Sequence, residues 1–116
     1  MRALLLVAAL LFGSVSAARA DPVGRYAIEG SNPGGGGAYR GSVEVTRTGE
    51  TFRVVWVIDG TRYVGTAIGD NKFLTVTYRS GNETGLALYG ANGANWDGIW
   101  AYAGGTATGR ERWVRR

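Results

Sequence analysis

Hydrophobic and polar residues alternate over short stretches of the chain after residue 20. Val43 and Val45 alternate with Glu44 and Thr46, as in a β-strand that buries one face. Residues 54–58 are apolar on both faces, which indicates a strand that is covered on both sides. No stretch of this part has the apolar spacing of an amphipathic helix. The pattern predicts an all-β protein.

Eight such stretches are separated by turn residues, mainly Gly, Asn and Asp. These residues suit tight turns because Gly reaches positive φ without steric cost and Asn and Asp tolerate it. The predicted strands are residues 25–30, 39–47, 51–58, 62–68, 72–78, 84–89, 95–102 and 107–114. Short connections predict an antiparallel up-and-down meander, and pairing of the last strand with the first would remove both edges. We therefore expect a small closed barrel, with a two-sheet sandwich as the alternative. The Trp-x-Gly-x-Trp motif of residues 96–100 resembles that of small ligand-binding barrels such as avidins and lipocalins, which implies an architecture of that kind.

The first twenty residues have the pattern of an export signal. Met1-Arg2 gives a positive start, residues 3–12 are uninterruptedly apolar, and Ala18-Arg19-Ala20 is the small-x-small pattern that signal peptidases accept. Ten apolar residues are too few to span roughly 30 Å of hydrocarbon as a helix. We expect a Sec-type signal peptide that is cleaved after Ala20, a bacterial periplasmic or secreted location, and no membrane span after cleavage. Residues 21–116 would then form a single β-barrel domain.

Composition excludes several classes of chemistry. The 116 residues include no Cys and no His, so disulfides, thiol nucleophiles, imidazole metal ligands and Ser-His triads are all excluded. Without Arg2 and Arg19, eleven basic residues stand against nine acidic ones, and the net charge falls from +4 to +2. We therefore expect no nucleic-acid partner, no metal and no cofactor. The oligomeric state is left open.

An aromatic residue stands two positions before a glycine in Tyr39-Arg40-Gly41, Tyr63-Val64-Gly65 and Trp96-Asp97-Gly98. Residues two apart share a strand face, so each ring can cover the bare backbone of its glycine. Alternatively, the rings line one mouth of the barrel as a binding surface. Tyr, Trp and Arg dominate binding hot spots. The candidate binding residues are Tyr39, Tyr63, Trp96, Trp100, Arg110 and Arg112.

Several short motifs carry a resemblance to a known family. They are Gly24-Arg25-Tyr26, Tyr39-Arg40-Gly41, Trp56, Trp96-Asp97-Gly98-Ile99-Trp100 and Gly109-Arg110-Glu111-Arg112-Trp113. Together they resemble small secreted bacterial β-proteins commonly labelled fibronectin-binding, over nearly all of the chain after residue 20. The resemblance implies a small extracytoplasmic β-domain and assigns no binding residue.

Two carboxylates, Asp97 and Glu111, are flanked by aromatic residues and lie close in sequence to Arg110 and Arg112. If the last two strands form a hairpin, an arginine can hold one of these carboxylates in a structural ion pair. The alternative is acid–base catalysis, which requires both carboxylates to face one cleft.

These observations favour an exported, non-enzymatic protein that binds an envelope or host-matrix macromolecule. One alternative is a carrier of a small apolar ligand in the barrel mouth. That alternative requires an open interior, and side chains such as Trp56, Leu74, Val76, Leu86 and Ile99 could fill it. The other alternative is a weak carbohydrate-active enzyme that uses Asp97 and Glu111.

Overall fold

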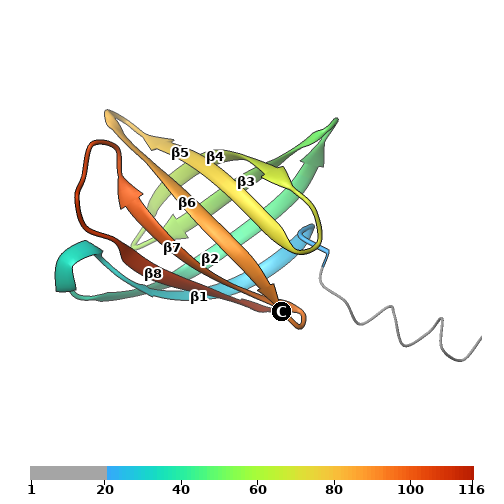
Figure 1. Cartoon of the computed structure of the whole chain (residues 1–116), viewed down its shortest axis with the longest axis horizontal. Coiled ribbons are helices and arrows are strands. Elements are labelled where there is room, and N and C mark those ends of the chain that lie inside the picture. The colour runs from blue at the N-terminus through green and yellow to red at the C-terminus, as the bar shows by residue number, and fades with distance from the viewer. Residues whose placement is uncertain (1–20) are drawn as a thin grey trace, which may run out of the picture.

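The computed structural model describes residues 21–116, which form a closed barrel of antiparallel strands (Figure 1). The strands are β1 (Gly24–Ser31), β2 (Ala38–Thr48), β3 (Thr51–Ile58), β4 (Thr61–Gly69), β5 (Phe73–Ser80), β6 (Glu83–Asn92), β7 (Asn95–Tyr102) and β8 (Gly109–Arg115). Each strand pairs with the next in sequence, and β8 pairs with β1 to close the sheet. The predicted all-β meander and its closure are confirmed, and the two-sheet alternative is wrong. The predicted signal peptide, residues 1–20, lies outside the described residues.

Turn chemistry sets the strand ends much as the sequence predicts. β3 and β7 begin and end at the predicted residues, and the largest difference is the extension of β6 to Asn92. In the β3–β4 turn, Asp59 and Gly60 have φ of 51° and 77°, the conformation that an Asp-Gly hairpin turn favours. The described helical content is one 3-10 turn, η1 (Pro33–Gly35), between β1 and β2. Within residues 21–116, no helix is long and apolar enough to cross a membrane.

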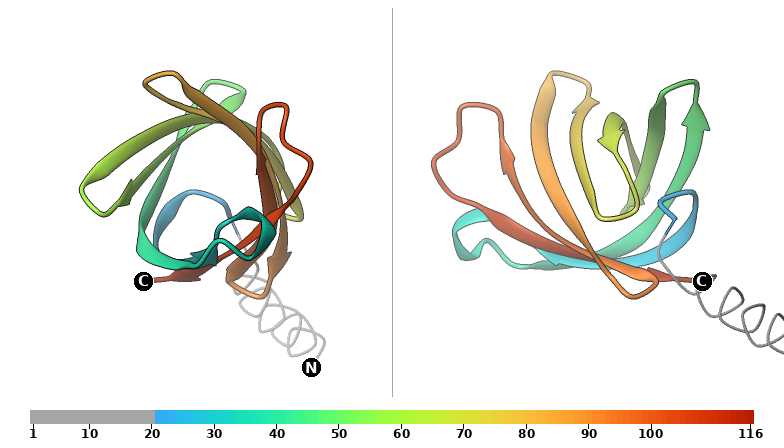
Figure 2. Two further views of the ribbon diagram at one scale, coloured as in Figure 1. Left: turned by 90° about the vertical axis from the view of Figure 1, so that its left-hand side faces the viewer. Right: turned by 45° about the vertical axis from the view of Figure 1, so that its right-hand side comes forward.

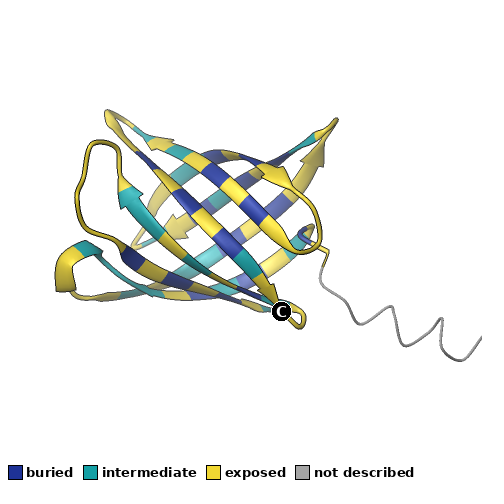
Figure 3. Ribbon diagram, in the orientation of Figure 1, coloured by how far each residue is buried: buried dark blue, intermediate teal, exposed yellow. Residues whose placement is uncertain are grey.

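Buried and exposed residues alternate along each strand, because successive side chains point into and out of the barrel (Figure 3). Trp56, Leu74 and Val76 are buried in the core as expected. Leu86 and Ile99 are instead exposed on the outer face, where both lie on strands whose alternate residues point inward. Of the five side chains that could fill the interior, three therefore lie in it and two do not.

Aromatic rings cover glycines in this barrel, as the sequence predicts, but the ring–glycine pairs are not the predicted ones. The rings do not cover the glycine two positions along their own strand. Of the three predicted rings, only Tyr39 covers a glycine, and that glycine is Gly30, directly opposite on the neighbouring strand. Two other rings do the same: Tyr78 faces Gly85 and Tyr89 faces Gly98. A Cβ atom at any of these glycines would overlap the facing ring. The glycines therefore let large rings lie flat against the barrel wall.

The two ends of the barrel differ. One end carries the β2–β3, β4–β5 and β6–β7 turns and is plugged by fully buried side chains; we call it the closed end. They are Tyr26, Phe52, Leu74, Trp96 and Trp113. The other end carries the β1–β2, β3–β4, β5–β6 and β7–β8 connections, and we call it the mouth; the left panel of Figure 2 looks towards it.

Candidate functional site

The mouth opens into a cavity of about 300 Å³. Seven aromatic side chains line it, from six different strands: Tyr39, Trp56, Tyr63, Tyr78, Tyr89, Trp100 and Tyr102. The space exists because Ala87 and several glycines occupy inward positions near the mouth, where larger residues would fill the barrel. The cavity is therefore an aromatic-lined recess that opens at one end.

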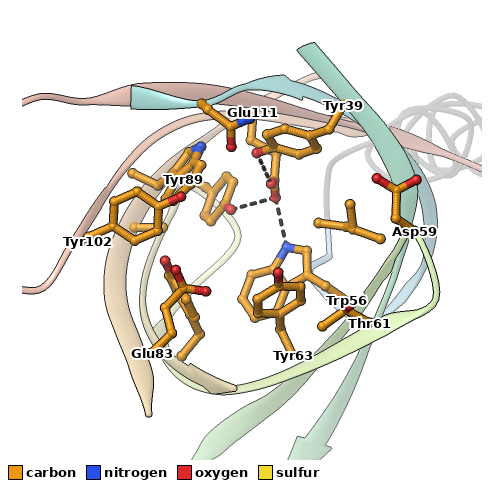
Figure 4. Close-up of a pocket in the computed structure, with 14 residues that line it drawn as sticks. Tyr39, Trp56, Asp59, Thr61, Tyr63, Glu83, Tyr89, Tyr102 and Glu111 are labelled. Carbon is orange, nitrogen blue, oxygen red and sulfur yellow. Dashed lines mark hydrogen bonds between the residues drawn. The ribbon is translucent and has the colours of Figure 1, made fainter. Parts of the chain in front are cut away.

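Glu111 forms the floor of this cavity and is only 6% exposed. Its Oε2 atom accepts hydrogen bonds from the indole N–H groups of Trp56 (2.8 Å) and Trp113 (2.7 Å) and from the Tyr89 hydroxyl (2.7 Å). Its Oε1 atom accepts a hydrogen bond from the Tyr39 hydroxyl at 2.6 Å. Figure 4 shows the Glu111 carboxylate at the centre of the surrounding rings. Charge-assisted hydrogen bonds of this kind offset the cost of burying the carboxylate.

Both tyrosines that donate to Glu111 are held in the protonated state. Burial, followed by the charge of Glu111, raises the pKa of the Tyr39 phenol and of the Tyr89 phenol above the ordinary value. Burial also raises the pKa of Tyr78, with smaller contributions from nearby acidic groups. The hydroxyls of Tyr39 and Tyr89 therefore donate to Glu111 across the neutral pH range.

Two more carboxylates, Asp59 and Glu83, line the cavity at its rim (Figure 4). Asp59 comes from the β3–β4 turn and Glu83 begins β6, so they approach the opening from separate parts of the barrel. Both carboxylates are exposed. Their charges affect the neighbouring Tyr63: burial is the largest cause that raises the pKa of its phenol, and the charges of Glu83 and Asp59 raise it further. Within residues 21–116, no group of three acidic side chains is arranged to hold a metal ion.

The structure divides the six candidate binding residues into three sets. Tyr39, Tyr63 and Trp100 line the cavity. Trp96 is fully buried in the closed end, so it cannot meet a partner there. Arg110 and Arg112 are exposed on the outer face of β8. The six residues therefore do not form one surface.

The two singled-out carboxylates also separate. Asp97 pairs with Arg112 on the outer face, with 3.7 Å between Oδ1 and Nε, whereas Glu111 points inward and bonds to no arginine among the described residues. The barrel wall lies between them, so they do not face one cleft. This geometry does not support acid–base catalysis by Asp97 and Glu111 as a pair.

Sequence reasoning missed Tyr78, Tyr89, Tyr102, Asp59 and Glu83 as cavity residues. The available signal was strand parity. Tyr78 lies two and four residues after Val76 and Leu74, and Tyr89 lies two after Ala87, on the faces that turn inward. The sequence held no such signal for Asp59 and Glu83 at the rim, because acidic residues are also common in turns that line no cavity.

No protein-family model matches this chain, and no curated protein matches it as a relative. The resemblance to the proteins labelled fibronectin-binding therefore gains no support from these comparisons. The function has to be argued from the geometry of the site.

Proposed function

We propose that this protein is a non-enzymatic binding protein that holds a small ligand in the barrel mouth. The observation that carries the proposal is the open cavity of about 300 Å³, with seven aromatic rings on its wall and one buried carboxylate on its floor. Ligand sites are concave, mostly apolar and furnished with a few fixed polar groups, and this volume lies at the small end of their range.

The polar floor is fixed before any ligand arrives. Four donors hold the two oxygens of Glu111, and those donors come from β2, β3, β6 and β8. A site built on paired strands needs little reorganisation on binding, which reduces the entropic cost of association. This arrangement supports a carrier or sensor better than a catalyst, because among the described lining residues the other carboxylates, Asp59 and Glu83, lie at the rim and not beside Glu111.

An NMR screen of the protein against a library of small soluble compounds tests the proposal. We expect the amide resonances of mouth residues to shift on binding while those of the closed end stay unchanged. Thr61→Trp narrows the mouth and should abolish these shifts. Thr66→Trp is the matched control, because Thr66 is exposed on the same strand but does not line the cavity. A library that yields no mouth ligand would overturn the proposal, as would binding that survives Thr61→Trp.

The second candidate function is the binding of an envelope or host-matrix macromolecule. The outer face favours it, because exposed Ile68, Leu88 and Ile99 lie in one row across β4, β6 and β7, with Thr75 between them. Adjacent exposed apolar side chains are typical of interaction surfaces. Immobilised fibronectin should then retain the wild-type protein and release Leu88→Asp. Equal retention of both proteins, or retention of neither, would count against this candidate.

A further inference from the structure

The charged groups that line the mouth cavity all have one sign. Glu111 lies at its floor and Glu83 and Asp59 at its rim, and none of the described lining residues is Lys or Arg. The arginines beside Glu111 in sequence, Arg110 and Arg112, are exposed on the outer face. The cavity is therefore negative although the whole chain carries a net charge of +4.

The charge of Glu111 is stabilised but not neutralised. Its four hydrogen-bond donors are hydroxyl and indole groups, which carry no formal charge. The carboxylate forms no ion pair with any residue in the described part of the chain. A negative charge in a low-dielectric cavity acts over several ångströms and favours a cation within it.

The hydrogen bonds of Glu111 narrow the choice of cation. Three donors occupy Oε2 and one occupies Oε1, so the carboxylate offers charge more than free acceptor positions. A primary ammonium ion needs three acceptors to replace its water. A quaternary ammonium group, whose nitrogen is fully alkylated, has no N–H donor and needs none, and it is attracted to aromatic faces and to negative charge without directional bonds.

The orientation of the rings fits the same kind of group. Tyr63 and Tyr78 meet edge to face, with centroids 6.0 Å apart and planes at 81°. Trp100 meets Tyr39 and Tyr78 in the same way, each at 6.2 Å. Rings turned against one another do not form a single flat platform for a planar ligand. The lining rings come from six strands and so surround the cavity on several sides, which suits a compact, rounded cation.

We infer, on the basis of the proposed ligand-binding function, that the mouth takes a small organic cation with a quaternary, fully alkylated ammonium head group. Tyr63, Tyr78 and Trp100 would contact the head group, and Glu111 would supply charge from the floor. Glu83 and Asp59 would draw the cation to the opening. This ligand class differs from the small apolar ligand that the sequence suggests as one alternative.

Isothermal titration calorimetry with two matched probes tests the inference. Choline carries the trimethylammonium head group, and 3,3-dimethyl-1-butanol is its uncharged carbon isostere. We expect choline to bind at least about tenfold more tightly, since a desolvated cation–aromatic contact and a carboxylate both favour it. Binding of choline should weaken as salt is raised from 0.05 to 0.5 M, whereas the isostere should respond little.

Variants of residues that line the cavity test whether choline binds in the mouth. Glu83→Gln keeps the size of an exposed side chain that forms no hydrogen bond within the described chain, and should weaken choline binding roughly two- to fivefold. Tyr63→Leu removes one ring face and should weaken it by a similar or larger factor. Glu50→Gln is the control, because Glu50 is exposed in the β2–β3 turn at the closed end. It should leave the affinity unchanged.

The outcomes separate the ligand class from the proposed function. Equal or tighter binding of the uncharged isostere would overturn the cation inference and leave a ligand-binding mouth. Failure of both probes, with mouth ligands still found in the library screen, would do the same. Failure of both probes together with an empty screen would overturn the cation inference and the proposed function alike.

Discussion

Replacement of the buried acceptor, Glu111→Leu, should destabilise the barrel strongly. Leu has a similar length but accepts no hydrogen bond. The substitution leaves three buried donors without a partner: the indole N–H groups of Trp56 and Trp113 and the hydroxyl of Tyr89. The hydroxyl of Tyr39 is only partly buried and can turn to water.

The structure sets the size of the effect. Each buried donor that loses its acceptor costs about 1–3 kcal/mol. The indole groups cannot rotate their N–H bonds elsewhere, because their rings are packed against each other and against neighbouring tyrosines. Removal of a buried charge offsets part of the loss. We expect the free energy of unfolding to fall by at least about 3 kcal/mol, which is a large share of the 5–15 kcal/mol typical of a domain.

Chemical denaturation followed by tryptophan fluorescence and by circular dichroism measures this loss. For a domain of this size, 3 kcal/mol corresponds to a fall in Tm of about 12 °C or more. Glu111→Gln retains one acceptor oxygen for the three donors and should lose less than Glu111→Leu. Glu83→Leu, at the exposed rim, should change stability by less than about 1 kcal/mol. If Glu111→Leu unfolds within 1 kcal/mol of the wild type, the polar floor is not a stabilising element and the reasoning is refuted.

Three further predictions concern the fold. Burial raises the pKa of Tyr89, so the folded state keeps this phenol protonated where the unfolded chain ionises, near pH 10. The free energy of unfolding, measured by thermal unfolding, should therefore keep this contribution below pH 10 and lose about 1.4 kcal/mol per pH unit above it. A free energy of unfolding that stays constant up to about pH 12 would contradict the burial of Tyr89. Gly98→Ala should cost about 1–3 kcal/mol in denaturant unfolding because the added Cβ overlaps the Tyr89 ring, whereas Gly90→Ala, which meets only ordinary contacts, should be tolerated; equal effects would count against ring packing. Asp97→Asn removes the half-exposed ion pair with Arg112 and should change the unfolding free energy by less than about 1 kcal/mol, and a larger loss would give that pair a role the geometry does not support.

The strands could be predicted from the sequence because they depend on local signals, and their closure could be predicted because it removes both edges of the meander. Turn residues such as Asp59-Gly60 mark the hairpins, and short connections leave few topologies besides a meander. The choice of inward face was harder. Leu86 and Ile99 are as apolar as core residues, yet they lie on the outer face because neighbouring Ala87 and Trp100 occupy the inward positions.

The candidate site was predicted only in part, because its residues meet through register. Tyr39 and Trp100 could be singled out from their glycine-rich surroundings, but Trp96, four residues before Trp100 on the same face, lies at the other end of the barrel. Glu111 was singled out for an ion pair with an arginine. The strand turns it away from both flanking arginines, and its four donors come from strands that only the closed barrel brings together.

Native mass spectrometry of the protein purified from the organism that makes it tests the central claim most directly. A small ligand that occupies the mouth should appear as one added mass per chain, and its exact mass and fragmentation should show a quaternary ammonium group. The added mass should be lost in Thr61→Trp and retained in Thr66→Trp. A bound compound that persists in Thr61→Trp, or a chain that carries no ligand and gains none when choline is added, would contradict the account.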